Sequence, residues 1–123
     1  MKDNELSVFL VNSEADGIRA AIAIASKIEQ QGAVGYALFD ADAITALGIT
    51  PDKTDGETPD AEVNTWHYEL RQLTFSRLAE IAKIVKRGQV EDIPLPIFKA
   101  RLQTAIAARQ LDEKQVHRKN LGR

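Results

Sequence analysis

The chain has 123 residues, no cysteine and a formal net charge of −2 at pH 7. This near-neutral total hides an acidic first half, with 12 Asp/Glu and 4 Lys/Arg in residues 1–62, and a basic second half, with 6 Asp/Glu and 12 Lys/Arg in residues 63–123. The composition excludes a disulfide framework, a thiolate zinc site and a cysteine nucleophile, and it favours a single domain, 1–123, in a reducing, cytoplasmic setting.

The first predicted elements are a strand, a helix and a second strand. Residues 6–11 are short, apolar and rich in β-forming residues, which indicates a buried strand. Ser13 is a suitable N-cap for a helix with apolar residues at three- and four-residue spacing, which Gly32 ends. Residues 33–39 indicate the second strand. Together these elements predict a βαβ-like unit over 1–48, with parallel strands and a right-handed crossover.

The middle of the chain is predicted to contain a short helix, a loop and a long helix. Asp40 caps the short helix, 41–47, which Gly48 ends. Residues 49–60 are rich in Pro, Asp and Thr, which predicts an acidic and mobile loop. A long helix is predicted from Thr58 or Asp60 to about Arg87. The rotation between its two apolar stripes suggests one core surface and one partner surface, but the favoured interpretation is that both stripes are core. The stripes are Val63, Trp66, Leu70 and Leu73, then Phe75, Leu78, Ile81, Ala82 and Val85.

The last third of the chain is predicted to be helical. Residues 90–96 form an irregular connection, and a helix starts at Pro94 or Pro96, where proline is tolerated. Asp112 is a suitable cap for a short basic helix or tail over 113–123. The sequence therefore predicts an α/β or α+β fold, in which the small N-terminal βαβ-like unit packs with two or three C-terminal helices over 61–123.

Asp40 and Asp42 are the candidate catalytic or metal-binding residues, because paired carboxylates after a strand can hold Mg²⁺. Residues 38–44 resemble the first motif of haloacid-dehalogenase-type phosphatases, which implies an aspartate nucleophile followed by an acid/base aspartate. The pair is also similar to the Asp-x-Asp motif of Toprim domains. Ala43 and Asn12 depart from these two patterns, respectively. The competing interpretation is that Asp40 caps a helix and Asp42 favours its positive end.

The basic second half contains the candidate partner surface. Trp66 lies in the densest aromatic group of the chain, and tryptophan is common in protein–protein hot spots. The cationic candidates for contacts with nucleic-acid phosphates or with an acidic protein are Lys86, Arg87, Lys99, Arg101, Arg109, Arg118 and Lys119. Residues 78–88 are also similar to the first helix of a helix-turn-helix. A solvated helix face explains the same charges without a partner.

The sequence contains no convincing catalytic set and indicates no cofactor. We therefore expect a small non-enzymatic regulatory or adaptor protein, bacterial or phage in origin, that works through protein–protein contacts, with an acidic partner and as a homodimer. The alternatives are a nucleic-acid-binding regulator and a metal-dependent phosphoryl-transfer enzyme. The longest apolar helical stretch, 18–28, is too short to cross a bilayer, so no membrane partner is expected.

Overall fold

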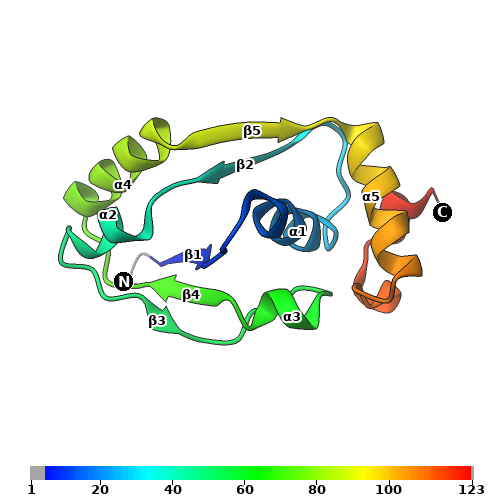
Figure 1. The fold of residues 1–123 in the computed structure, drawn as a ribbon, viewed down its shortest axis with the longest axis horizontal. Coiled ribbons are helices and arrows are strands. Elements are labelled where there is room, and N and C mark those ends of the chain that lie inside the picture. Colours follow the sequence, from blue (N-terminus) through cyan, green and yellow to red (C-terminus); the bar gives the residue numbers. More distant parts are fainter. Residues whose placement is uncertain (1–4, 123) are drawn as a thin grey trace.

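The computed structural model describes residues 5–122 and shows a mixed fold of helices and short strands (Figure 1). In chain order the elements are β1 (Leu6–Phe9), α1 (Glu14–Ala25), β2 (Val34–Leu38), α2 (Ala41–Thr45), β3 (Asp52–Lys53), α3 (Ala61–Asn64), β4 (His67–Leu70), α4 (Phe75–Arg87), β5 (Gln89–Ile93) and α5 (Leu95–Ala107), followed by 3₁₀ turns at Glu113–Gln115 and Arg118–Leu121. The predicted α+β class is confirmed. Residues 1–4 and 123 of the predicted domain lie outside the described residues.

The strands form two small antiparallel sheets within the described part of the chain, in the orders β1-β4-β3 and β2-β5. Leu6 lies opposite Leu70, and Val34 lies opposite Ile93. The predicted parallel pairing within 1–48 is therefore wrong. Each of its two strands pairs with a strand from the second half of the chain, and β1 and β2 run in opposite directions in Figure 1. Apolar patterning indicated that the strands would be buried, but it carries no information about their partners.

The first helix begins as predicted but ends early. Ser13 caps α1 by accepting a hydrogen bond from the Asp16 backbone N–H at 3.2 Å. The helix ends at Ser26, well before Gly32. Ser26 is buried, and its hydroxyl donates to the Ala23 carbonyl at 2.7 Å. Such a bond competes with the helical ladder and favours an end at this position.

The short second helix is confirmed. Asp40 accepts a hydrogen bond from the Asp42 backbone N–H at 2.9 Å and so caps α2. Gly48 follows with φ of 79°, a left-handed conformation that glycine adopts without strain. Residues 49–60 form an irregular loop apart from β3, as predicted, but the loop contributes the buried side chain of Ile49 to the core.

The single long helix predicted over 60–87 is wrong, because the segment divides into α3, β4 and α4. Gln72 has φ of 55°, which interrupts any helix at that point. Thr74 then caps α4 by accepting from the Arg77 backbone N–H at 3.1 Å. β4 lies between β1 and β3, so sheet pairing overrides the helical period of its side chains. The two apolar stripes therefore lie on separate elements and do not form two surfaces of one helix.

The irregular connection predicted over 90–96 is wrong in its first part, which is β5. This strand pairs along its whole length with β2. It also follows α4 after a single residue. In a helix-turn-helix a turn and a second helix would come at this position, so residues 78–88 are not the first helix of that motif.

The start of α5 is confirmed, with Pro94 before the helix and Pro96 in its first turn. The segment predicted as a short helix or tail over 113–123 contains two short 3₁₀ turns in its described part. Asp112 caps the first of them by accepting from the Lys114 backbone N–H at 3.1 Å. Among residues 5–122, no helix combines the length and the apolar character that crossing a membrane requires.

Asn120 ties the last turn to the end of α1. Its side chain is fully buried, and its amide group donates to the carbonyls of Ser26 and Ile28 at 3.0 and 2.9 Å. Its amide oxygen accepts from the Gln30 backbone N–H at 2.9 Å. These bonds satisfy backbone groups that the early end of α1 leaves without helical partners.

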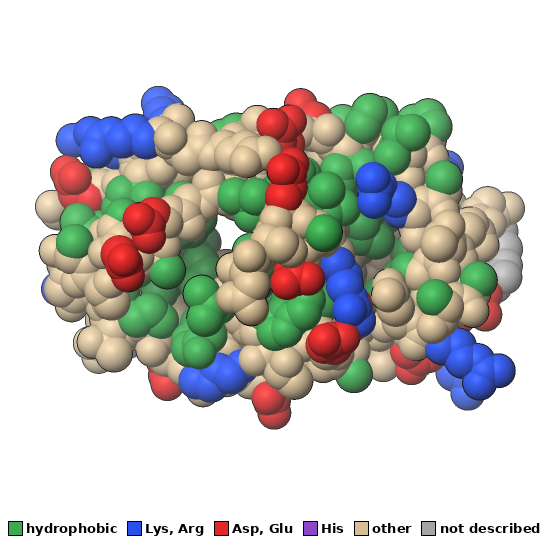
Figure 2. All heavy atoms as spheres, in the orientation of Figure 1, with side chains coloured by type: hydrophobic (Ala, Val, Ile, Leu, Met, Phe, Trp, Pro, Cys, Tyr) green, Lys and Arg blue, Asp and Glu red, His purple; other side chains and the backbone are tan. Residues whose placement is uncertain are grey.

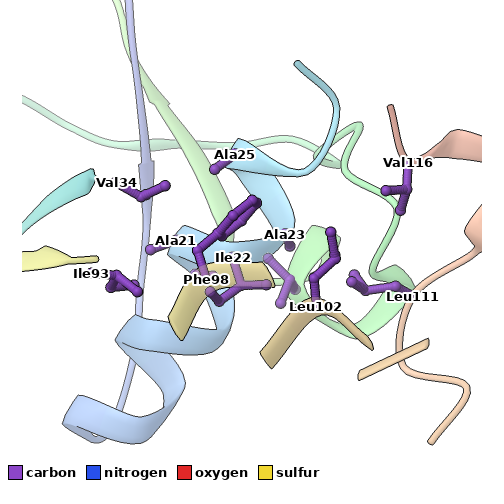
Figure 3. Close-up of a cluster of buried hydrophobic side chains, with 12 residues drawn as sticks. Ala21, Ile22, Ala23, Ala25, Val34, Ile93, Phe98, Leu102, Leu111 and Val116 are labelled. Carbon is purple, nitrogen blue, oxygen red and sulfur yellow. The ribbon is translucent and has the colours of Figure 1, made fainter. Parts of the chain in front are cut away.

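Two clusters of buried apolar side chains form the core. In the larger cluster, Phe98 and Leu102 of α5 are completely buried, and Figure 3 shows them beside Ile22 and Ala23 of α1. The smaller cluster joins α2, β4 and α4 through Ile44, Ile49, Leu70, Leu73 and Ile81. β1 contributes to both, since successive strand residues point to opposite faces and Val8 and Phe9 pack against different clusters.

The start of β5 approaches the end of β2 too closely to admit a side chain. A Cβ atom on Gly88 would lie 2.2 Å from the Leu38 carbonyl oxygen. We expect Gly88→Ala to lower the free energy of unfolding by about 1–3 kcal/mol, because relieving this clash shifts the backbone. Gly32→Ala is the matched control, since no atom lies within 4 Å of its added Cβ. Urea unfolding measures both variants, and equal midpoints would contradict the close approach.

Candidate functional site

Two strand edges face each other across an opening that we call the β1–β2 gap. The gap widens into a larger mouth of about 380 Å³ and a smaller mouth of about 180 Å³. Both mouths share the lining residues Val8, Phe9, Ala37, Leu38 and Phe39. Figure 2 shows an opening in the surface at this position, between the places of β1 and β2 in Figure 1. The two mouths are therefore the two sides of one feature.

The backbone of β1 presents unpaired groups to the gap. The Leu10 N–H donates to the Trp66 carbonyl at 2.9 Å, which marks this pair as hydrogen-bonded in the antiparallel ladder. Hydrogen-bonded and non-hydrogen-bonded pairs alternate along such a ladder. Val8 therefore turns its backbone groups towards β4, whereas Ser7 and Phe9 turn theirs towards the gap. β2 likewise pairs only with β5 among the described strands, which leaves its other edge unpaired.

Exposed apolar side chains border both mouths. Leu10 is 51% exposed at the larger mouth, and Ile24 is 46% exposed at the smaller one. An apolar opening between two strand edges is a hazard that a folded protein normally covers or blunts with charge. The gap therefore has the physical character of an interaction surface.

The charged side chain that lines the gap among the described residues is an aspartate, and no described Lys or Arg lines either mouth. Asp42 lines the larger mouth, next to the exposed Asp40. At the smaller mouth, burial raises the pKa of Tyr36, and the nearby carboxylates of Glu14 and Glu91 raise it further. Figure 2 shows acidic side chains on both sides of the opening, with Lys and Arg side chains farther from it.

A third cavity, of about 550 Å³, lies between α1 and α5 beside a buried ion pair. Arg19 donates through Nε and Nη2 to both carboxylate oxygens of Asp60, at 2.7 and 3.1 Å, and its Nη1 lies 2.9 Å from Glu62. The Asp60 carboxylate, 2% exposed, also accepts from the N–H groups of Glu62 and Val63 and so caps α3. The Arg19 guanidinium lies 5.8 Å from the Trp66 ring centre. Arg19 and Asp60 thus bind groups of the protein itself, and the structure gives no reason to treat them as ligand-binding residues of this cavity.

Asp40 and Asp42 lie together at the start of α2, and Asp40 acts as the helix cap. The capping interpretation of Asp40 is therefore confirmed. Among residues 5–122, no cluster of three or more His, Asp or Glu side chains is placed to hold a metal ion. The strand before the pair belongs to a two-stranded antiparallel sheet, whereas the expected α/β site lies at the end of parallel strands.

The basic candidates fall into two groups. Lys86 and Arg87 end α4. The other group lies on α5, just after it, or in the last 3₁₀ turn, and consists of Lys99, Arg101, Arg109, Arg118 and Lys119. The five residues of β5, about 17 Å long, separate the groups, and α4 and α5 lie at opposite ends of the molecule in Figure 1. Trp66 is half-buried, packing against the larger core cluster under Arg19. The structure does not bring these residues onto one surface.

Sequence reasoning missed the β1–β2 gap. Its lining residues come from strands that were assigned to the interior, and one sequence does not show which strand edges stay unpaired. The signal was present in residues 6–11, whose continuous apolar run predicts burial on both faces. That run forms β1 at the edge of its sheet, and the described residues leave part of its apolar surface exposed.

Comparison of the chain with protein-family models, with curated proteins and with solved structures found no significant match.

Asp60 stabilises two parts of the fold, since it binds Arg19 and caps α3. We expect Asp60→Ala to lower the free energy of unfolding by about 3 kcal/mol, because Arg19 and the start of α3 both lose a buried partner. Asp112→Ala removes an exposed cap and serves as the control, with an expected loss of about 0.5–1 kcal/mol. Urea unfolding measures both. A similar loss in the two variants would show that burial of Asp60 adds nothing beyond capping.

Tyr36 provides a test of the acidic surroundings of the gap. Its pKa lies above the ordinary value of 10.0, first through burial and then through Glu14 and Glu91, while Arg101 acts in the opposite direction. We expect Glu91→Gln to lower this pKa and Arg101→Gln to raise it, measured by NMR titration of ¹³Cζ-labelled tyrosine. Because the unfolded chain releases this proton first, Tyr36 should weaken the fold as pH rises above 10. Identical curves in both variants would argue against the electrostatic contribution.

Proposed function

We propose that the protein is a small non-enzymatic regulatory or adaptor protein that acts in the cytoplasm through protein–protein contact at the β1–β2 gap. The observation that carries this proposal is the pair of unpaired strand edges facing each other across an apolar opening. A partner that fills the opening would satisfy backbone groups and cover exposed apolar surface at the same time.

The composition of the gap supports binding rather than catalysis. Its shared lining is entirely apolar, and its nearest charges are carboxylates on the rim. A catalytic site concentrates perturbed acids, bases or nucleophiles inside a cleft. The gap instead combines an apolar centre with a charged rim, which is the usual anatomy of a protein interface.

The charge of the rim changes the kind of partner that we expect. The sequence favoured an acidic partner for the basic second half, but Asp42 lines the gap, and near Tyr36 the effects of Glu14 and Glu91 are each larger than that of Arg101. The proposed contact therefore suits a basic partner. A homodimer is the other form that this contact can take, with a second copy covering the same opening. No specific observation favours the nucleic-acid-binding or metal-dependent alternatives, whose residues lie apart or act as a helix cap.

A photo-reactive amino acid at position 10 tests the proposal, because Leu10 is exposed at the larger mouth. We expect light to produce a covalent adduct of discrete mass in the source cells. Position 97 is the matched control, since Ile97 on α5 is also apolar and 48% exposed but lies outside the gap. The adduct should be absent there.

The partner identified by mass spectrometry is then purified and its affinity measured. We expect Leu10→Asp to weaken this affinity at least about tenfold and Ile97→Asp to leave it unchanged. Failure of position 10 to form any adduct, or equal effects of the two Asp variants, would contradict protein binding at the gap.

A further inference from the structure

On the basis of this proposed function, we propose that the β1–β2 gap accepts an extended peptide segment of another protein as an added strand, and that this segment has small and large apolar residues in alternation, flanked by Lys or Arg. The inference specifies the chemistry of the partner and the mode of binding. It rests on three properties of the gap: its backbone edges, its unequal mouths and its acidic rim.

The backbone edges require an extended occupant. Ser7 and Phe9 direct their N–H and C=O groups into the gap, and β2 presents its unpaired edge from the other side. An extended peptide offers donors and acceptors on both of its sides, whereas a helix has used its own backbone groups internally. A strand of about five residues would match β1 and β2 in length and would join the two sheets into one. It would run parallel to one neighbour and antiparallel to the other.

The two mouths favour different side chains. Successive residues of a strand point to opposite faces, so alternate residues of the peptide would enter the two mouths. The larger mouth holds about 380 Å³ and the smaller about 180 Å³. At the smaller mouth α1 packs closely on β2, since a Cβ atom on Gly17 would lie 2.7 Å from Leu38 Cδ2. Large apolar residues therefore fit one face of the peptide and alanine-sized residues fit the other.

The rim favours positive charge at the ends of the segment. Asp42 lines the larger mouth and Asp40 adjoins it, while Glu14 and Glu91 lie beside Tyr36 at the smaller mouth. Arg101 of α5 also acts on Tyr36, in the opposite direction and less strongly than either carboxylate, and no described Lys or Arg lines the gap itself. Lys or Arg outside the apolar part of the peptide would meet these carboxylates, and acidic residues at the same places would be repelled.

The experiment uses the full chain, labelled with ¹⁵N, and three synthetic peptides with blocked ends. The first is Lys-Arg-Val-Ala-Leu-Ala-Val-Lys-Arg, and the second replaces its four cationic residues by Glu. The third carries N-methyl groups on both alanines, which removes two N–H donors from one edge without changing charge. Amide chemical shifts are followed during titration. Asp42→Asn is the protein variant, chosen because this exposed side chain can be neutralised without disturbing the core.

We expect the first peptide to cause saturable shifts at the Ser7 and Phe9 amides and along β2. Its dissociation constant should be at least about tenfold smaller than that of the acidic peptide. N-methylation should weaken binding roughly fivefold or more. Asp42→Asn should weaken binding of the first peptide roughly two- to fivefold.

Several results would overturn the inference. Equal affinity of the acidic peptide would exclude a basic segment, and equal affinity of the N-methylated peptide would exclude strand addition. Absence of shifts at β1 and β2 with every peptide would exclude an extended occupant, even where a partner still forms the adduct at position 10 through a folded surface. Shifts at β1 and β2 that depend on protein concentration alone would assign the gap to a second copy of this chain.

Discussion

The buried carboxylate of Asp60 is the contact on which the arrangement of the first half depends. It binds the guanidinium of Arg19 on α1 with both oxygens and caps the start of α3 with one of them. The Asp60 N–H in turn donates to the Thr58 hydroxyl at 3.1 Å, which fixes the end of the preceding loop. Since α3 is followed within a few residues by β4, this side chain links α1 to the segment that leads into the central strand of the larger sheet.

Helix caps could be predicted from the sequence, whereas the pairing of strands far apart in the chain could not. Ser13, Asp40 and Asp112 were predicted as helix caps because a cap bonds to N–H groups only two or three residues away. The strands β4 and β5 were missed because their identity depends on partners far along the chain. His67–Leu70 has the apolar spacing of a helix and becomes a strand only between β1 and β3.

The candidate site was even less accessible to sequence reasoning. Asp40 and Asp42 were singled out as chemistry-bearing residues, and they do border the gap, but as charges on a rim and as a helix cap. The gap itself exists because, among the described strands, β1 and β2 each have a hydrogen-bonded neighbour on one edge only. With the two sheets not joined by hydrogen bonds, packing connects them, through α1 in the larger core cluster and through α2 and α4 in the smaller one. Gly17 allows the packing of α1, because its missing side chain lets Leu38 of β2 pack directly against this helix.

The burial of Asn120 has a consequence for how the chain is made. Its bonds to Ser26, Ile28 and Gln30 span 90 to 94 residues, so at least 90 further residues must be synthesised before the segment that follows α1 acquires these partners. A ribosome adds residues far more slowly than a helix forms. The last carbonyls of α1 find local partners in residues 26–30, but the Ser26 and Ile28 carbonyls just after the helix lack the bonds from Asn120 until that residue is made. The turn that follows the first helix is therefore among the last parts of the fold to be completed, although it is made early.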